Sequence, residues 1–589
     1  MKVCEQQIDL LETSESFILR GKEASLQINR SNNKLSLINS KDVQSVDVKP
    51  LHRVSAVLGS IQLLAGRYLV VAKESVPVAK IDKIHTIYCV SEVKIIPYYQ
   101  KPVAPQHAVD ESKYLELLTT ILNDGTFYFS YTYDATISTQ NWFQQAPSMN
   151  YVGEKSDEHF LWNGYLASDF TRQGEVAQGW FVPLIRGFVE TKEAKVGDST
   201  FSLTLISRKG CKRVGTRYNI RGADMLGNVA NFVETEQIVE YGNHFISYIQ
   251  VRGSIPLIWS QKANIQYKPP FVMKKEASGK PFEKHFDHIL DRYSNIVMVN
   301  LVNQKGSEKK LADEYRNLCN DYTKKDKIKY IAFDFHHKCK SMNYSAISEL
   351  TDQVEPLMKE HQYFHMNTTD GKILKYQTGI IRSNCIDCLD RTNVCQSVFA
   401  KIMLTEQLHT LKLLPNEQKV TDYKALNHTF QNIWADNGDR ISLIYAGTGA
   451  IKADFTRTGT RTWSGLLNDG VNSITRYYLN NFKDGIKQDS VNLLLGKYIV
   501  KPSGKSPFEQ ENQSNVFFSV LKYGFFVSLF MLAASASKVP SSESLTTGLL
   551  SVIFYLAITV AIYFLLVLNG RKIVNNPCLV DDEEDHKHK

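Results

Sequence analysis

The chain has 589 residues, and 43% of them are hydrophobic, which excludes a mostly disordered protein and predicts a buried core divided among two or three domains. The net charge of +8 is modest, so an anionic partner is plausible but not required. The 9 cysteines form no paired framework, which favours a reducing compartment over a disulfide scaffold.

The N-terminal third is predicted to be a β-rich module. The first residues, MKVCEQQIDL, lack the basic start and apolar run of a secretory signal. Short apolar runs such as ASLQINR and HTIYCVSEVKIIPY then alternate with polar breaks, a pattern typical of antiparallel strands. We assign this module to residues 1–180.

From about Trp180 the pattern changes. Strand-like runs such as HFISYIQVRGSIPLIWS and NIVMVNLVN alternate with helix-like runs such as SEKKLADEYRNLCNDY and AISELTDQVEPLMKEH. Alternation of this kind predicts a mixed α/β domain, which we assign to residues 181–500. In the run YIAFDFHHKCK, Asp334 and His336 fall on the opposite face of a predicted strand from Phe333 and Phe335, and we interpret them as structural support.

A basic run, SRKGCKRVGTRYNIR, lies early in the second domain. Such a run is often only a solvated face, but beside an anionic bilayer each exposed cation contributes about 1 kcal/mol. Interleaved aromatic residues are sparse, which disfavours nucleic acid as the partner. A membrane-facing patch and a plain solvated face therefore stay open for its six cations: Arg208, Lys209, Lys212, Arg213, Arg217 and Arg221.

The stretch RSNCIDCLDRTN, residues 382–393, carries the strongest chemical signal. The preceding YQTGIIRSN predicts a strand, and the following RTNVCQSVFAKIMLTEQLHTL predicts a helix because Val394, Val398 and Ile402 recur at helical spacing. The loop between them should therefore present its side chains at a helix N-terminus. Unpaired N–H groups and the helix dipole bind anions at that position.

Cys385 and Arg391 give this loop the pattern Cys-x5-Arg. A helix N-terminus lowers the pKa of a thiol from its usual value of about 8.5, and the thiolate is the nucleophilic form. The guanidinium of Arg391 matches two phosphate oxygens at once. The pattern therefore predicts a phosphate cradle with a thiolate nucleophile.

Two other interpretations start from the C-x-x-C formed by Cys385 and Cys388. Structural zinc is disfavoured because no second pair follows at the required spacing. A redox pair is disfavoured because it has no use for Arg391 or for two carboxylates in the loop.

Asp387 and Asp390 are both candidates for protonating a leaving group. A general acid must keep its proton near neutral pH, so its pKa has to be raised by burial or by another carboxylate. The sequence does not order the two residues. Bracing the loop through backbone N–H groups is as consistent with either one taken singly as acid catalysis, and we expect at least one of them to donate.

Two apolar runs near the C-terminus, residues 516–537 and 545–568, each have the roughly 20 residues needed to cross a bilayer as a helix. Two buried helices of a soluble core are the alternative, which is disfavoured because only Lys522 is charged within the runs. The short connector predicts a hairpin, and basic flanks place the body and the tail, residues 569–589, in the cytosol.

Residues 501–515 are predicted to be a flexible tether. Four sequons should then remain unglycosylated: Asn343, Asn367, Asn427 and Asn512.

The stretch RSNCIDCLDRTN resembles the signature of the Sac-domain phosphoinositide phosphatases, the suppressor-of-actin family. Other stretches resemble the family too, namely GTRYNIRGADMLGNVANFVETEQI, SYIQVRGSIPLIWSQ, YIAFDFHHKCK and WADNGDRISLIYAGTGA. The resemblance extends over nearly the whole chain, including the membrane hairpin of the endoplasmic-reticulum and Golgi member. The chain ends in DHKHK, which departs from the two-lysine retrieval signal common in such members.

The resemblance implies a β-rich N-terminal Sac module, a mixed α/β cysteine-phosphatase-like catalytic domain and a two-helix transmembrane hairpin. It implies removal of phosphate from phosphatidylinositol monophosphates, chiefly the 4-phosphate and also the 3-phosphate, with no metal or other cofactor, in a membrane protein with trafficking or contact-site partners. A catalytically silent phosphoinositide-binding tether is the alternative.

The roles implied for single residues follow the loop. Cys385 would form a phosphocysteine, Arg391 would hold the equatorial oxygens, and Asp387 or Asp390 would donate a proton, while loop amides stabilise the transition state. Thr392 would hydrogen-bond the thiolate. The loop positions expected to bind substrate are Asn384, Ile386, Cys388, Leu389, Thr392 and Asn393.

Overall fold

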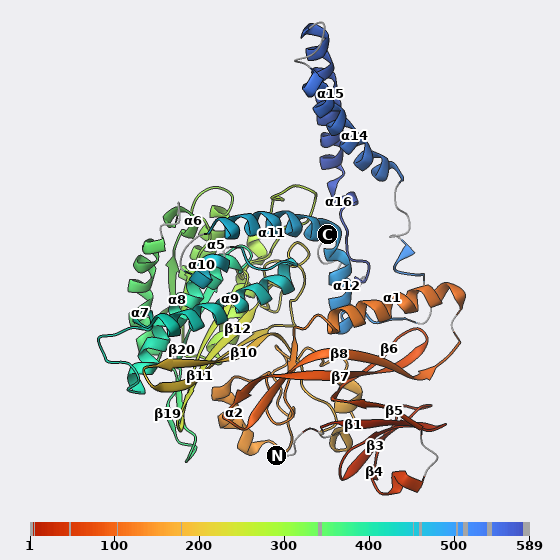
Figure 1. The fold of residues 1–589 in the computed structure, drawn as a ribbon, viewed down its shortest axis with the longest axis vertical. Coiled ribbons are helices and arrows are strands. Elements are labelled where there is room, and N and C mark those ends of the chain that lie inside the picture. Colours follow the sequence, from red (N-terminus) through yellow and green to blue (C-terminus); the bar gives the residue numbers. More distant parts are fainter. Residues whose placement is uncertain are drawn as a thin grey trace.

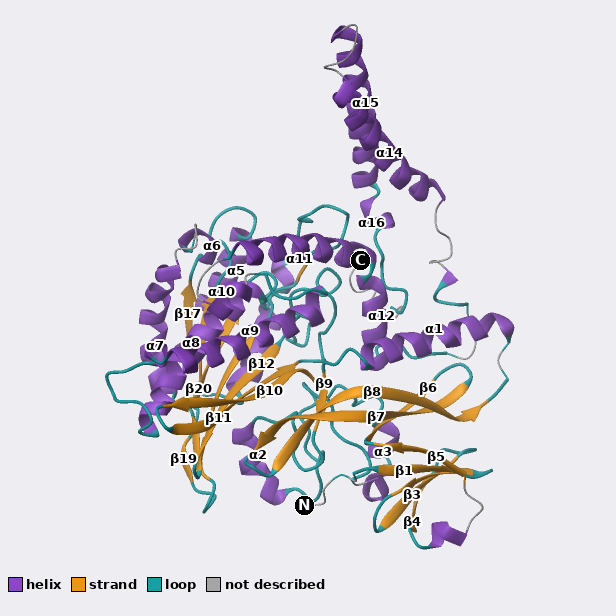
Figure 2. Cartoon of the chain, viewed as in Figure 1, coloured by secondary structure: helices purple, strands orange, loops and turns teal. Residues whose placement is uncertain are grey.

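The computed structural model describes residues 4, 6–45, 49–102, 104–177, 179–339, 344–451, 453–458, 462–501, 505–509, 516–538 and 545–580. Figure 1 shows a body of sheets and helices from which two C-terminal helices extend, and Figure 2 shows that strands dominate the N-terminal side of the body. The mixed α/β class that the sequence predicts is confirmed.

The N-terminal residues form a five-stranded antiparallel sheet in the order β4-β3-β2-β1-β5. Its alternating strands, such as SFILR in β2, bury Phe17 and Leu19 against the next strands of the chain, where Leu69 and Val71 contribute to the same core. The strands are β1 (Ile8–Glu12), β2 (Ser16–Arg20), β3 (Ala24–Asn29), β4 (Leu35–Asn39) and β5 (Lys49–Val54).

A second, larger sheet runs through the rest of the body in the order β17-β16-β20-β13-β12-β11-β10-β9-β8-β7-β6, and β18 and β19 extend it beside β13. Because β9 pairs with β10, the sheet continues across residue 180, where the sequence places a domain boundary. The strands before the boundary are β6 (Ala56–Gln62), β7 (Gly66–Ile81), β8 (His85–Gln100) and β9 (Phe127–Phe129). Those after it are β10 (Ile185–Val196), β11 (Ser199–Lys209), β12 (Val233–Tyr241), β13 (His244–Arg252), β16 (Asn295–Asn300), β17 (Ile328–Ala332), β18 (Phe364–Asn367), β19 (Ile373–Lys375) and β20 (Gly379–Asn384).

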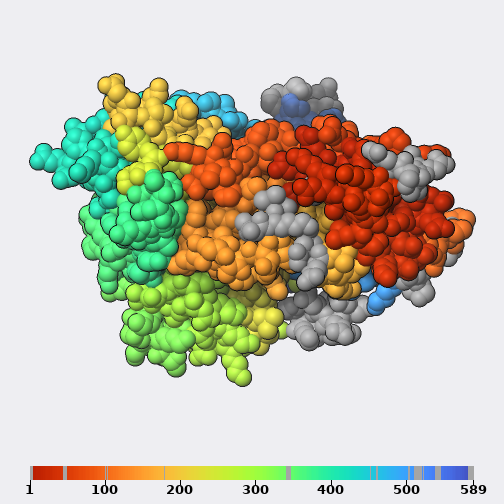
Figure 3. All heavy atoms as spheres, turned by 90° about the horizontal axis from the view of Figure 1, so that it is seen from below, coloured from red at the N-terminus to blue at the C-terminus, as the bar shows by residue number. Residues whose placement is uncertain are grey.

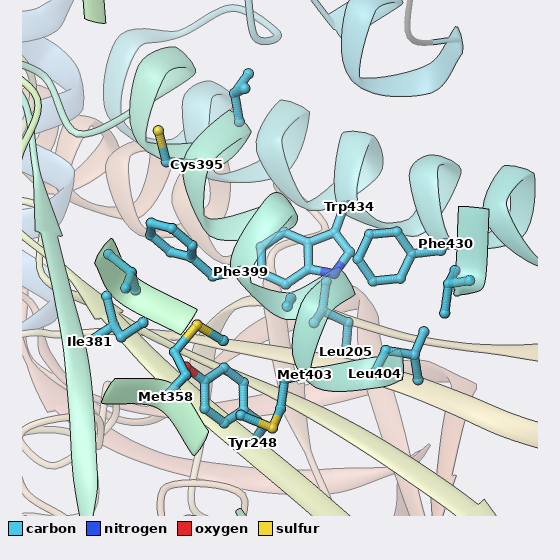
Figure 4. Close-up of a cluster of buried hydrophobic side chains, with 14 of the residues drawn as sticks. Leu205, Tyr248, Met358, Ile381, Cys395, Phe399, Met403, Leu404, Phe430 and Trp434 are labelled. Carbon is cyan, nitrogen blue, oxygen red and sulfur yellow. The ribbon is translucent and has the colours of Figure 1, made fainter. Parts of the chain in front are cut away.

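The parallel part of this sheet, formed by β13, β20, β16 and β17, carries helices on both faces. Ile296 and Met298 of β16 pack with α4 and α5, whereas Val297 and Val299 pack with α7 and α8 on the other face. Two buried faces explain the uninterrupted apolar run NIVMVN. Figure 4 shows the second of these cores, in which Phe399 of α8 and Trp434 of α9 are labelled. The helices are α4 (Gly279–Leu290), α5 (Lys309–Asp321), α7 (Ser348–His361), α8 (Asp390–Thr410) and α9 (Lys424–Ala446).

The strand predicted for YIAFDFH is too long, because β17 ends at Ala332 and a short helix, α6 (Phe335–Lys338), follows. Asp334 caps this helix: one carboxylate oxygen accepts a hydrogen bond from the His337 N–H at 3.0 Å, and the other accepts one from the Gln304 N–H at 2.8 Å. The interpretation of Asp334 as structural support is therefore confirmed.

Further helices complete the body, namely α1 (Pro105–Leu122), α2 (Thr139–Gln145), α3 (Ser168–Thr171), α10 (Ala453–Thr458), α11 (Trp463–Phe482) and α12 (Asp484–Leu494). Buried residues of α1 and α12 share one core, so α12 packs against the N-terminal part of the chain. Figure 3 shows the face of the molecule opposite the C-terminal helices, where the two parts lie side by side.

The two predicted membrane runs form helices α14 (Val516–Lys538) and α15 (Leu545–Leu568). Among the described residues, one segment, Thr546–Leu568, is long and apolar enough to span a bilayer, whereas the apolar segment of α14 is limited to Tyr523–Ser537. The two-span hairpin is therefore not confirmed. Its connector after Lys538, most of the predicted tether and the tail from residue 581 lie outside the described residues.

Candidate active site

The loop from Cys385 to Leu389 joins β20 to the N-terminus of α8. β20 is paired in parallel on both sides, with β13 and with β16, so the loop leaves the carboxyl end of a central strand. This is the edge at which open α/β sheets bind ligands. The strand, loop and helix that the sequence predicts here are confirmed.

Cys385 is 2% exposed, and its Sγ accepts a hydrogen bond from the backbone N–H of Cys388 at 3.1 Å. Burial alone would raise the pKa of the thiol, but the side chain of Cys388, the charge of Arg391 and the hydroxyl of Thr392 together lower this pKa to about 6. The buried Thr392 hydroxyl has no hydrogen-bond partner within the described structure, so no other group competes for its proton. Cys385 is therefore a thiolate at neutral pH.

Cys388 gives the loop its shape. Its φ of 54° is rare for a residue with a side chain and turns its N–H toward the sulfur of Cys385. The Cys388 Sγ donates to the carbonyl of Gly253 at 3.0 Å, and burial raises the pKa of this thiol well above its ordinary value. The loop therefore holds one thiolate and one neutral thiol.

Arg391 lies in the first turn of α8, and one nitrogen, Nη1, anchors it to the loop that follows β16. Nη1 donates to the carbonyl of Leu301 at 3.2 Å, to Asn303 Oδ1 at 3.3 Å and to Glu308 Oε2 at 3.3 Å. Burial acts to lower the pKa of Arg391, but the thiolate of Cys385 and the carboxylate of Glu308 raise it. No hydrogen bond from Nε or Nη2 is found in the described part of the chain, so both can meet a bound anion.

Asp387 is held by two arginines. Arg217 Nε donates to Asp387 Oδ1 at 3.0 Å and Arg217 Nη2 to Oδ2 at 2.8 Å, while Arg221 Nη2 lies 2.7 Å from Oδ1. Burial acts to raise the pKa of Asp387, yet the two guanidinium groups hold this pKa far below its ordinary range. Asp387 is therefore ionised and has no proton to donate.

Asp390 is in a different environment at the first position of α8. Its Oδ1 accepts a hydrogen bond from the N–H of Ile451 at 2.6 Å, and its Oδ2 lies 3.5 Å from Nη1 of Arg476 in α11. Burial raises the pKa of Asp390, and Arg476 and the backbone hydrogen bond only partly oppose this rise. Of the two loop acids, Asp390 is thus the one that better retains a proton.

Three of the positions predicted to bind substrate have side chains that face the protein. Asn384 donates to Asn300 Oδ1 at 2.6 Å, and Asn393 donates to the carbonyl of Trp434 at 3.0 Å. Leu389 is 2% exposed within an apolar cluster. Ile386 is half-buried. Asn384, Leu389 and Asn393 support the loop from behind, which leaves the loop N–H groups, Cys385 and Arg391 to meet a ligand.

The expectation that the basic run is a membrane-facing patch or a solvated face is wrong for most of its cations, because they are buried or half-buried. Arg208, Lys209 and Arg221 are 0%, 1% and 2% exposed. Arg208 forms ion pairs with Glu236 at 2.8 Å and Glu234 at 3.2 Å, because a buried cation requires partners. Arg213 and Arg217 are half-buried, and Arg213 donates to backbone carbonyls. Lys212 is the one exposed cation of the fully described run, with a side chain that is 41% exposed and pairs with Glu158 at 3.0 Å.

The structure adds residues that the sequence analysis did not assign to the site, namely Arg217 and Arg221 on Asp387, Glu308 on Arg391 and Arg476 on Asp390. No local pattern links residues so far apart in the chain, although Arg217 and Arg221 do lie in the stretch GTRYNIRGADMLGNVANFVETEQI. Among the described residues, no group of three or more His, Cys, Asp or Glu side chains could hold a metal ion.

Known proteins resemble this chain over most of its length. Residues 55–340 match the model of the SacI homology domain. The chain is 37% identical to phosphatidylinositol-3-phosphatase SAC1-B of Danio rerio over 98% of both chains. It is 40% identical to phosphatidylinositol-3-phosphatase SAC1 of Drosophila melanogaster over 77% of this chain and 76% of the relative. It is also 36% identical to the protein of the same name from Saccharomyces cerevisiae, over 90% of this chain and 86% of the relative.

Proposed function

The chain belongs to the SacI-homology family of phosphoinositide phosphatases, and we propose that it hydrolyses the phosphate monoester of phosphatidylinositol monophosphates, chiefly the 4-phosphate and also the 3-phosphate. One observation carries this proposal. The buried thiolate of Cys385 lies at the N-terminus of a helix, beside the guanidinium of Arg391. A thiolate paired with a cation in a loop of N–H groups suits attack on a phosphate dianion.

In the first step, Cys385 Sγ attacks phosphorus as the bond from phosphorus to the inositol oxygen breaks. Arg391 Nε and Nη2 hold two equatorial oxygens, and the loop N–H groups stabilise the charge that develops in the transition state. Asp390 gives its proton to the leaving oxygen, which departs as the inositol hydroxyl. The product is a phosphocysteine.

In the second step, water attacks the phosphocysteine, and the Asp390 carboxylate takes the proton from this water. The sulfur–phosphorus bond breaks, which regenerates the Cys385 thiolate and releases inorganic phosphate. Asp387 is a positioning residue in this scheme, because its carboxylate is occupied by Arg217 and Arg221 and therefore fixes the loop against the body.

Phosphate release by the full-length chain in lipid vesicles tests the proposal. Wild type should release phosphate from phosphatidylinositol 4-phosphate, and more slowly from the 3-phosphate, whereas Cys385→Ser should release none. Cys89→Ser is a matched control, because Cys89 is half-buried and lies in β8, outside the loop. An inactive wild type would favour the alternative, a phosphoinositide-binding tether without turnover.

We further infer that α14 and α15 form a two-span hairpin that anchors the body on the cytosolic face of endoplasmic-reticulum and Golgi membranes. Large apolar side chains of α15 are exposed, for example Ile553 at 60% and Phe554 at 61%, and the rings of Phe525 in α14 and Tyr563 in α15 are 6.4 Å apart. Exposed apolar helices of this kind suit a hydrocarbon environment.

Glycosylation and microscopy test this topology. The sequons at Asn367 and Asn427 should carry no glycan in cells, and an added sequon in the connector after Lys538 should be glycosylated because it would face the lumen. A fluorescent fusion should colocalise with endoplasmic-reticulum and Golgi markers. Glycan on either body sequon would contradict the cytosolic placement.

A further inference from the structure

Helix α11 (Trp463–Phe482) has its apolar and polar faces reversed relative to a helix of a soluble body. Large apolar side chains are exposed along it: Trp463 84%, Leu466 50%, Leu467 71%, Val471 62%, Ile474 73% and Tyr478 51%. Their spacing of three or four residues places them on one stripe. The only charged residues of α11, Asp469 and Arg476, are 8% and 4% exposed and lie on the opposite side.

The inner face of α11 reaches the active-site loop. Arg476 Nη1 lies 3.5 Å from Asp390 Oδ2, and the same side chain donates through Nε to Thr448 at 3.0 Å. One turn further on, Asn480 Oδ1 accepts from Arg217 Nη1 at 3.4 Å. The helix is therefore fixed to the body by polar contacts, and its apolar stripe is left facing outward.

The outer face of α11 is continuous with the candidate membrane helices. Phe482, its last residue, packs in one cluster with Leu521 of α14, Leu566 of α15 and Ile573 of α16 (Gly570–Ile573). Figure 1 shows α11 along the edge of the body from which α14 and α15 rise, crosswise to both. A helix in this position runs along the membrane surface if α15 crosses it.

Exposed cations surround this junction. Lys483 follows α11 directly, and Arg571 and Lys572 lie in α16. An apolar helical face flanked by lysine and arginine suits the interface of a bilayer, where the apolar side chains enter the acyl region and the cations meet anionic headgroups.

We propose that the outer face of α11 inserts into the bilayer that holds α15, as an in-plane helix. Because Asp390 lies on the inner side of the same helix, insertion would place the active-site loop about one helix diameter, roughly 10 Å, from the lipid headgroups. The site then acts on the membrane that anchors the chain. This inference goes beyond the proposed function, because it assigns the surface that docks rather than the reaction.

Tryptophan fluorescence gives a test that does not depend on activity. Of the six tryptophans, Trp463 is 84% exposed, whereas Trp142, Trp162, Trp180, Trp259 and Trp434 are at most 3% exposed. The full-length chain is reconstituted in vesicles with brominated acyl chains, which quench only tryptophans in contact with lipid. Wild type should be quenched, and Trp463→Phe should lose this quenchable component. Equal quenching of the two proteins, with acrylamide quenching Trp463 from the water phase, would overturn the proposal.

A second test compares two substrates, phosphatidylinositol 4-phosphate in vesicles and a water-soluble short-chain form. Leu467→Gln with Ile474→Gln keeps side-chain size and helix propensity but removes apolar contact, so the ratio of vesicle to soluble hydrolysis should fall about tenfold or more. Leu374→Gln is the control, because Leu374 is 45% exposed in β19 and away from α11, and it should leave the ratio unchanged. An unchanged ratio in the double variant would contradict docking. An inactive wild type would reject the proposed function instead, and the fluorescence result would still decide docking.

Discussion

Arg217 and Asp387, 170 positions apart in the chain, form a two-point ion pair in which Arg217 Nε and Nη2 each meet one oxygen of the carboxylate. Arg221 adds a third contact at 2.7 Å. A carboxylate in this environment stays ionised, whereas burial raises the pKa of Asp390, three residues further along the loop. Two acids that the sequence leaves equivalent thus acquire different roles from their neighbours.

Asp390→Asn should lower kcat/KM for phosphatidylinositol 4-phosphate about 100-fold, because the inositol oxygen would leave without a proton. With an aryl phosphate such as methylumbelliferyl phosphate, whose leaving group needs no proton, the same variant should keep nearly the wild-type kcat/KM, which reports formation of the phosphocysteine, although its kcat should fall because the second step lacks its base. Steady-state kinetics with both substrates measures the difference. An equal loss of kcat/KM on both substrates would mean that Asp390 shapes the loop rather than donating the proton.

Asp387→Asn should act mainly on stability. The substitution leaves two guanidinium groups, one of them 1% exposed, without their shared carboxylate, and breaking a buried ion pair from one side costs about 3 kcal/mol or more. Thermal unfolding of the detergent-solubilised chain should show a lower midpoint than wild type. Arg217→Lys should cause a smaller loss, because lysine keeps the charge but not the two-point geometry. A midpoint equal to that of wild type would show that the pair contributes no net stability.

The reactivity of Cys385 should follow its pKa of about 6. Only the thiolate is alkylated, so the rate of inactivation by iodoacetamide should rise as the pH increases through about 6 and then level off. Removing the hydroxyl in Thr392→Val withdraws one stabiliser of the thiolate, so the midpoint should shift to higher pH. Mass spectrometry of the labelled peptide, with Cys385→Ser as a control, identifies the modified sulfur. A midpoint near the ordinary thiol value in wild type would refute the thiolate assignment.

The local architecture of the site could be predicted from the sequence, because it depends on neighbours in the chain. Helical spacing after residue 390 and an apolar run before residue 385 were enough to place Cys385 at a helix N-terminus. The predicted exposure of the basic run was wrong because it depends on residues that are far apart in the chain. Its charges suggested a surface, but the partners that bury Arg208 and Arg221 come from strands and loops that no local pattern connects. Tertiary pairing decides whether a cation is solvated or buried.

Local sequence patterns were also insufficient for α11 and for the membrane runs. Apolar length alone indicated both membrane runs, and the structure supports one segment of sufficient length and hydropathy, Thr546–Leu568. In α11, residues such as Leu467 and Ile474 look like an ordinary core stripe in the sequence. Only the fold shows that the opposite, polar face of α11, which carries Arg476, packs against the body.

Glu308→Ala should lower kcat/KM about tenfold, because Arg391 would lose the carboxylate that holds Nη1 and with it the orientation of Nε and Nη2 toward phosphate. Glu308→Gln should lose less, since its amide oxygen still accepts from Nη1. Inhibition by vanadate, which binds the cradle without turnover, should weaken in the same order. Kinetics identical to wild type in both variants would show that the backbone carbonyl of Leu301 and the side chain of Asn303 suffice to position Arg391.

Cys388 should protect Cys385 from irreversible oxidation. Peroxide converts the Cys385 thiolate to a sulfenic acid, which can condense with the neighbouring Cys388 thiol to give a disulfide and water. The backbone N–H of Cys388 is already 3.1 Å from Cys385 Sγ, so the two residues are adjacent in the folded loop. Wild type inactivated by peroxide should recover activity with dithiothreitol. The Cys388→Ser variant should recover much less, because the sulfenic acid of Cys385 has no thiol partner there and is oxidised further. Cys89→Ser should behave as wild type, and equal recovery of Cys388→Ser and wild type would exclude the protective disulfide.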